Sequence, residues 1–275
     1  MNPKLKLWVN GDIVEPDLPH ISAEDRSFLL GDGCFETLRW SNGKIEGVGE
    51  HLDNLKRACS LLGIQLNRSD ADLEEVLAFQ GESLKGWEFD AAIRVTVSRG
   101  AGGRGASAVQ ADPNIVVSAS LLQQTRPYAG LSVMTSTIRR NETCQSSRIK
   151  STSYVSNLAA RKEAADAGFD EALMLNTQGR VACLAMANIA MVERLTKTIW
   201  TPPVEEGVRP GYQRGEVLRM LSKQGWRIAE VPIELEELSC EGREVFGLNS
   251  LWGVRPVRKL DRVALLVTEH DLPGA

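Results

Sequence analysis

The stretch Ser147-Arg148-Ile149-Lys150-Ser151-Thr152-Ser153-Tyr154 holds one lysine between small polar residues, directly before a helical pattern that begins at Tyr154. A single lysine is usually a solvated surface charge. At a strand end and among small side chains, however, a lysine can lose its hydration, which lowers its pKa and lets it form a Schiff base with a carbonyl group. The spacing of these residues leaves both interpretations of Lys150 open.

The residues around this stretch predict a mixture of helices and strands. We expect helices over residues 154–167 and 211–224, and the first has Ser151, Thr152 and Ser153 as candidate N-caps. Strands are predicted at 131–138, 171–175 and 180–192, of which the last two are joined by the turn Asn176-Thr177-Gln178-Gly179. Together they form one α+β half of the chain.

The earlier half of the chain shows a second α+β pattern. Its predicted strands span residues 34–40, 91–98 and 115–121, and its predicted helices span 50–62 and 70–84. Residues 123–130, which include Pro127 and Gly130, are typical of a linker. The sequence therefore predicts an α+β protein with an N-terminal domain at 1–122, a linker at 123–130 and a C-terminal domain at 131–275.

Composition excludes several functional classes. The chain has 275 residues and a net charge of −4, which argues against non-specific binding to nucleic acid. No apolar run approaches the ~20 residues that span a bilayer, and the N-terminus has no apolar signal segment, so we expect a cytoplasmic protein without membrane contact. The five cysteines and three histidines show neither disulfide-framework nor metal-site spacing.

Two glycine-containing motifs are candidates for anion binding. Gly100–Gly105 matches G-x-G-x-x-G, but too few residues follow it for the crossover helix of a dinucleotide fold, so we reject that interpretation. The loop still places Arg99 and Arg104 where they could recognise an anionic substrate, and a merely solvated loop is an equal alternative. The stretch Val208–Arg214 precedes a helix start that could hold a phosphate, although an ordinary helix start is the favoured interpretation when the stretch is taken alone.

Three separated segments resemble the class IV aminotransferase superfamily, the pyridoxal-phosphate enzymes of fold-type IV. They are Asp25–Thr37 with Glu50-His51-Leu52, the residues from Ile149 to Asn188, and those from Thr201 to Val257. The resemblance covers nearly the whole chain in the family's order. It implies a two-domain α+β fold with a C-terminal pseudo-barrel that carries the Schiff-base lysine, pyridoxal 5'-phosphate as cofactor, a homodimer and a small anionic amino substrate.

Within this superfamily, residues Ser98–Gly105 are most similar to the aminodeoxychorismate lyases, which make 4-aminobenzoate and pyruvate for folate synthesis. The resemblance implies that Lys150 is the Schiff-base lysine and proton shuttle, that Thr37 assists proton transfer, and that Arg104 faces the substrate carboxylates. The residues that it assigns to cofactor binding are Lys150, Tyr154, the backbone N–H groups of Tyr212 and Gln213, and the turn at Asn249 and Ser250.

The chain departs from the family pattern at two cofactor positions. Asn54 stands where the pattern H-L-x-R-L has a phosphate-binding arginine, and Arg57 on the same predicted helix is a partial substitute. Cys183 stands where G-x-V-x-E has the glutamate that keeps the pyridine nitrogen protonated. A neutral thiol at this position should impair transamination and racemisation more than elimination, and it should allow only weak cofactor binding if other contacts are also lost.

These departures leave three hypotheses. The chain is a lyase-like enzyme with an altered cofactor site, a pseudoenzyme or binding protein that keeps the fold, or a branched-chain or D-amino-acid aminotransferase. The lyase is favoured because Lys150, Tyr154 and Thr37 are retained. Cys183 makes the aminotransferase the least favoured of the three.

Overall fold

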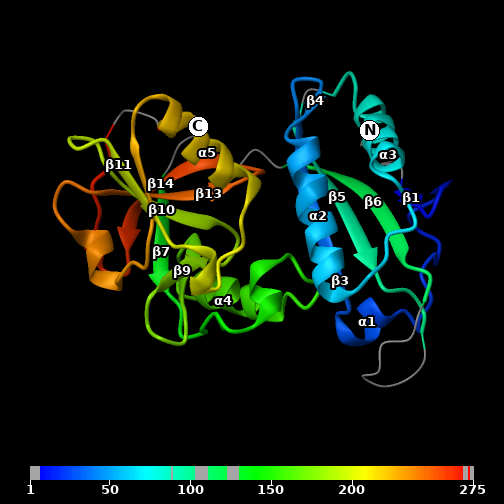
Figure 1. The fold of residues 1–275 in the computed structure, drawn as a ribbon, viewed down its shortest axis with the longest axis horizontal. Coiled ribbons are helices and arrows are strands. Elements are labelled where there is room, and N and C mark those ends of the chain that lie inside the picture. Colours follow the sequence, from blue (N-terminus) through cyan, green and yellow to red (C-terminus); the bar gives the residue numbers. More distant parts are fainter. Residues whose placement is uncertain (1–6, 88, 103–110, 123–129, 269–271, 273–275) are drawn as a thin grey trace. The chain divides into compact units, whose positions relative to one another are not determined.

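The computed structural model describes residues 7–87, 89–102, 111–122, 130–268 and 272, and the chain divides into two compact units (Figure 1). Unit 1 consists of Met1–Thr125 and Ile149–Ser153, and unit 2 consists of Arg126–Arg148 and Tyr154–Ala275. The segment with Lys150 therefore packs with unit 1, although the sequence places it inside the C-terminal domain.

Unit 1 is built on a six-stranded sheet with the order β2-β1-β6-β5-β3-β4. Its strands are β1 (Leu7–Val9), β2 (Asp12–Val14), β3 (Gly33–Ser41), β4 (Lys44–Ile45), β5 (Ala91–Ser98) and β6 (Asn114–Leu121). Strands β5 and β6 flank the glycine-rich loop and pair antiparallel. A dinucleotide-binding crossover needs parallel strands, so the rejection of that motif is confirmed.

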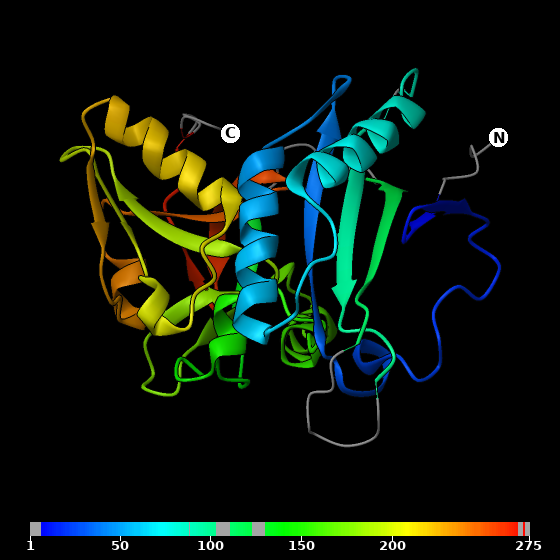
Figure 2. The same cartoon turned by 45° about the vertical axis from the view of Figure 1, so that its right-hand side comes forward.

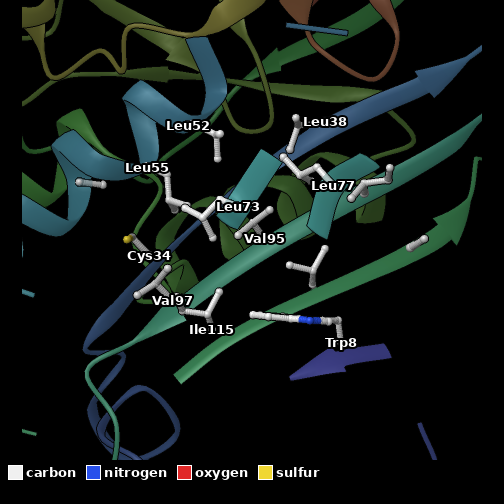
Figure 3. Close-up of a cluster of buried hydrophobic side chains, with 14 of the residues drawn as sticks. Trp8, Cys34, Leu38, Leu52, Leu55, Leu73, Leu77, Val95, Val97 and Ile115 are labelled. Atoms are coloured by element: carbon white, nitrogen blue, oxygen red, sulfur yellow. The ribbon is translucent and has the colours of Figure 1, made fainter. Parts of the chain in front are cut away.

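Helices α2 (Val48–Leu62) and α3 (Asp70–Ser83) cover one face of this sheet (Figure 2). Gly63 ends α2 in the left-handed conformation at φ 65°, which glycine adopts without steric cost. Leu52 and Leu55 of α2 and Leu73 and Leu77 of α3 point toward the apolar side chains of the strands (Figure 3). A short helix, α1 (Arg26–Leu30), precedes β3.

The segment that carries Lys150 pairs with the edge of β3. The backbone N–H of Phe35 donates to the carbonyl of Lys150 at 2.8 Å, and the N–H of Thr152 donates to the carbonyl of Gly33 at 2.9 Å. The preceding residue, Ile149, is buried in the core of unit 1. Lys150 thus follows a short 3₁₀ helix, η1 (Gln145–Arg148), and not the strand end that the sequence suggested.

Unit 2 contains a nine-stranded sheet in which β15 pairs with β14 beside the main order β12-β11-β10-β13-β14-β7-β8-β9. The strands are β7 (Leu131–Thr135), β8 (Glu171–Leu175), β9 (Val181–Leu184), β10 (Asn188–Glu193), β11 (Thr198–Thr201), β12 (Arg227–Glu230), β13 (Glu244–Asn249), β14 (Gly253–Leu260) and β15 (Val263–Ala264). The sheet curls around one apolar cluster to which strands β7–β10, β13 and β14 contribute.

Two helices cover the outside of this curled sheet. Helix α4 (Val155–Asp166) places Ala160 and Ala164 against β8 and β9, and helix α5 (Tyr212–Lys223) packs against β10, β11 and β13. Two more 3₁₀ helices, η2 (Val204–Glu206) and η3 (Leu235–Ser239), lie in the connections.

The structure corrects two predictions about unit 2. The predicted strand at 180–192 is two strands, because residues 185–187 form a turn between β9 and β10. Helix α4 has Tyr154 as its N-cap with no side-chain hydrogen bond to the first turn, so the serines and threonine at 151–153 do not cap it. Ser151 and Thr152 instead belong to the segment that pairs with β3.

Within the residues whose structure is described, no helix has the length and apolarity that crossing a membrane would require.

Candidate active site

In unit 1, Lys150 lies against an aromatic ring that a second cation also contacts. Its Nζ atom is 4.9 Å from the centroid of Phe35, and the guanidinium carbon of Arg94 is 3.6 Å from the same centroid. Thr37 is two residues beyond Phe35 on β3 and pairs directly with Arg94 on β5. Side chains two residues apart share a sheet face, so Lys150, Thr37 and Arg94 surround one side of Phe35. Two cations and a hydroxyl on one face favour an anionic ligand.

Arg94 is a site residue that the sequence analysis missed. It lies in the alternating run Ala91–Ser98, where its position is that of an ordinary outward-facing strand residue. Its Nε atom donates to Thr96 Oγ1 at 3.1 Å, which orients the guanidinium along the sheet. The signal that could have identified it is its cross-strand position opposite Thr37, which requires the pairing of β3 with β5.

Asn54 lies apart from this group. It is on α2, which covers the other face of the sheet, and its side-chain oxygen accepts from Arg57 Nη1 at 3.2 Å. Arg57 thus reaches the position that the family pattern gives to an arginine. Arg104 falls in 103–110, outside the described residues.

In unit 2, two predicted cofactor residues meet at one turn. We define the β9–β10 turn as residues 185–187, and the hydroxyl of Tyr154 donates to the carbonyl of Ala185 at 3.5 Å. Asn249 donates through Nδ2 to the carbonyl of Met186, and Asn157 donates to Ala185 at 2.7 Å. The fold therefore brings Tyr154 and Asn249 together, although the two residues are far apart in the sequence.

Tyr154 and Cys183 are both held in their neutral forms. Burial raises the pKa of Tyr154 to about 12, with a further contribution from Cys183, and the charges of Arg209 and Arg140 oppose the rise. The side chain of Cys183 is 6% exposed, and burial raises the pKa of its thiol. A neutral thiol at this position cannot supply the negative charge of the family glutamate.

The start of α5 is suited to an anion. Its N-cap is Gly211, which has no side chain to accept from the N–H groups of the first turn, and that turn contains no acidic residue. A Cβ atom on Gly211 would lie 2.2 Å from Asn188 Oδ1, so only glycine fits there. Tyr212 and Gln213 occupy the first turn, where the helix dipole favours a phosphate.

The turn after β13 adds a second polar element to unit 2. Its side-chain oxygen, Asn249 Oδ1, accepts from the N–H of Leu251 at 2.7 Å, and Ser250 lies between these residues. With its Oδ1 and Nδ2 both engaged, Asn249 has a fixed orientation.

A second residue that the sequence analysis did not identify as functional is Glu171, at the first position of β8. Its side chain is fully buried, and Oε1 accepts from the N–H of Ala172 at 2.9 Å. Burial raises the pKa of Glu171 to about 7, against the opposing effects of the Ala172 N–H, the Arg161 charge and the N–H groups of Met186 and Ala185. The only signal in the sequence is one acidic residue at the head of an apolar strand.

Known proteins resemble this chain along nearly its whole length. It is 28% identical over 261 residues to a putative branched-chain-amino-acid aminotransferase of Methanocaldococcus jannaschii, covering 94% of this chain and 88% of that protein. It is 28% identical over 257 residues to an aminodeoxychorismate lyase of Vibrio harveyi, covering 91% of this chain and 89% of the lyase.

A solved structure shows the same fold. The branched-chain aminotransferase from the thermophilic archaeon Thermoproteus uzoniensis, determined with norvaline, matches with a TM-score of 0.88 at 23% identity. The match covers 96% of this chain and 90% of that one. The predicted two-domain α+β fold of fold-type IV is confirmed.

The model of the family described as amino-transferase class IV matches residues 33–260, which include every described residue of the candidate site. The chain therefore belongs to the class IV aminotransferase family of pyridoxal-phosphate-dependent enzymes.

Proposed function

We propose that this protein is an aminodeoxychorismate lyase-like enzyme that uses pyridoxal 5'-phosphate and releases 4-aminobenzoate and pyruvate. The observation that carries the proposal is the grouping of Lys150, Thr37 and Arg94 around Phe35, which sets an amine, a hydroxyl and a fixed cation on one face of a sheet. The similarity to the Vibrio harveyi lyase supports the same activity.

The residues present suit the phosphate of the cofactor. The glycine-capped start of α5 offers backbone N–H groups at Tyr212 and Gln213, and the turn at Asn249 and Ser250 adds polar groups. When bound, the cofactor supplies an aldehyde for the amine of the substrate and a ring that withdraws electrons from its α-carbon. Tyr154 remains a neutral hydrogen-bond donor toward the ring because its pKa is raised to about 12.

Each of the other residues has a separate task in this proposal. Lys150 binds the cofactor through Nζ and moves a proton between Nζ and the substrate. Thr37 donates its hydroxyl proton toward the leaving group. Arg94 binds a substrate carboxylate, and Arg104 binds a second one.

The neutral thiol of Cys183 favours elimination over transamination. Transamination requires the ring to store the electron pair of the substrate α-carbon, and a carboxylate beside the pyridine nitrogen promotes that storage. Cys183 is buried with a raised thiol pKa, so it offers no charge to that nitrogen. Asn54 removes a further phosphate contact, and weak cofactor binding follows unless Arg57 replaces it.

We also infer that the protein works as a homodimer. The three apolar side chains of α1 are exposed, and Phe28 is the most exposed of them at 75%. Water-exposed apolar side chains that are contiguous in sequence are typical of surfaces that a partner covers.

An assay of the two half-reactions tests the proposal. The protein is loaded with pyridoxal 5'-phosphate and given 4-amino-4-deoxychorismate, and 4-aminobenzoate and pyruvate are measured in parallel with keto-acid formation from branched-chain and D-amino acids. Equimolar 4-aminobenzoate and pyruvate supports the lyase. Turnover of the amino donors with no 4-aminobenzoate would assign an aminotransferase, as the relative in Methanocaldococcus jannaschii suggests. No reaction and no cofactor binding would assign a protein that keeps the fold without the chemistry.

A further inference from the structure

The β9–β10 turn is held by side chains from three other elements of unit 2. On its carbonyl side, Ala185 accepts from Tyr154 and Asn157, and Met186 accepts from Asn249. Two of these three donors are the predicted cofactor residues Tyr154 and Asn249. The position of the turn therefore determines where both of them point.

On the N–H side of the same turn lies the carboxyl group of Glu171. The N–H groups of Met186 and Ala185 are close enough to lower the pKa of Glu171, and the N–H of Ala172 donates to its Oε1 atom. The Ala172 carbonyl in turn accepts from the N–H of Ala185 at 2.8 Å, so the start of β8 and the turn are tied together. Glu171 thus faces the side of the turn opposite to the carbonyl groups that Tyr154, Asn157 and Asn249 bind.

The burial of Glu171 favours its neutral form. The side chain is fully buried, and no described residue hydrogen-bonds to its Oε2 atom. The cation that acts on it is Arg161 of α4, whose Nη1 atom is also buried without a hydrogen-bond partner among the described residues, so no ion pair joins the two. An unpaired carboxylate in such surroundings is costly, whereas a protonated one is not.

We propose that Glu171 is a positioning residue of the cofactor site, which holds the β9–β10 turn as a neutral acid and thereby orients Tyr154 and Asn249. The inference rests on the proposed binding of pyridoxal 5'-phosphate. The ionisable groups around Glu171 are Arg161 on α4, Tyr154 at the start of α4 and Cys183 on β9. Cys183 supplies no charge, so the acid at this turn is the carboxyl of Glu171.

Two substitutions separate the acceptor from the charge. Glu171→Gln keeps a carbonyl oxygen and stays neutral, whereas Glu171→Leu keeps the approximate volume and removes the acceptor. A matched control is Glu244→Leu, which removes a buried carboxylate of unit 2 that bonds Arg194 and Thr268. Glu244 pairs with Val192, at the end of β10 that is remote from the turn. The dissociation constant of pyridoxal 5'-phosphate is measured by visible absorption for each variant.

We expect Glu171→Gln to change that constant by less than about threefold and Glu171→Leu to raise it by about tenfold, the effect of leaving a buried N–H without its acceptor. Equal affinities for Glu171→Leu and the wild type, or an equal loss in Glu244→Leu, would overturn the proposal.

A second readout needs no cofactor. Hydrogen exchange of the peptide that contains residues 183–188 is measured in the apoprotein, and we expect faster exchange in Glu171→Leu but not in Glu171→Gln or Glu244→Leu. Unchanged exchange in Glu171→Leu would overturn the role of Glu171. If the wild type fails to bind pyridoxal 5'-phosphate while the exchange result holds, the proposed function fails and the turn-positioning role stands.

Discussion

Replacing Glu171 by glutamine changes the pH dependence of stability in a direction that the structure determines. The carboxyl has an ordinary pKa of 4.5, and burial raises it to about 7 in the folded protein. Between these two values the folded chain holds a proton that the unfolded chain has released. Unfolding then loses a proton, so the wild type becomes less stable as the pH rises from 4.5 to about 7.

The size of this effect follows from the difference between the two pKa values. Each pKa unit corresponds to about 1.4 kcal/mol, so a shift from 4.5 to about 7 corresponds to about 3 kcal/mol of lost stability at pH 8. Glutamine has no titrating proton and keeps the neutral shape. The free energy of unfolding of Glu171→Gln, minus that of the wild type, should therefore rise by about 3 kcal/mol between pH 4.5 and pH 8.

Urea denaturation of both apoproteins at pH 4.5, 6, 7 and 8 measures this difference. Glu142→Gln is the control with the opposite sign, because hydrogen bonds from Thr177 lower the pKa of Glu142 to about 2. That contribution is present above pH 4.5 and is lost as the pH falls toward 2, so Glu142→Gln should be less stable than the wild type at neutral pH. A flat or falling difference for Glu171→Gln would refute the assignment of a neutral buried acid.

Four further substitutions test other parts of the structure. Lys150→Ala should abolish the absorption band of bound cofactor and all turnover while leaving the unfolding midpoint nearly unchanged, because its Nζ lies on the face of a ring at 4.9 Å from the centroid; a retained band would contradict its role. Cys183→Glu should increase transaminase activity at least severalfold relative to lyase activity, and an unchanged ratio would count against the argument from ring charge. Gly211→Ala should weaken cofactor binding about tenfold in a titration, since the new Cβ would lie 2.2 Å from Asn188 Oδ1, and unaltered affinity would remove the start of α5 from the site. Phe28→Asp should shift the molar mass in light scattering from dimer to monomer, whereas a monomeric wild type would contradict the proposed dimer.

Elements with local signals were predictable from the sequence. Helix α2 has apolar residues at helical spacing and a glycine at its end, and the structure places it at Val48–Leu62 with Gly63 as the cap. Strand β5 alternates in burial and lies at Ala91–Ser98, as predicted. Both patterns depend on neighbours within one element, so a single sequence carries them.

Features that depend on distant residues were not predictable. Residues 181–192 are apolar throughout most of their length and contain no glycine or proline, yet the chain turns at 185–187 because Asn157 and Asn249 bind the carbonyl groups there. Lys150 joins unit 1 through pairing with β3, which lies far earlier in the chain. Arg94 became a site residue only through its position opposite Thr37.

The most direct test of the central claim is covalent trapping of the cofactor. The purified protein is mixed with pyridoxal 5'-phosphate, its visible spectrum is recorded, and the sample is reduced with borohydride, digested and analysed by mass spectrometry. We expect a yellow species that reduction converts into a fixed phosphopyridoxyl adduct on the peptide that carries Lys150. The absence of any absorption band at saturating cofactor, or an adduct spread over surface lysines and absent from Lys150, would contradict the proposed cofactor chemistry.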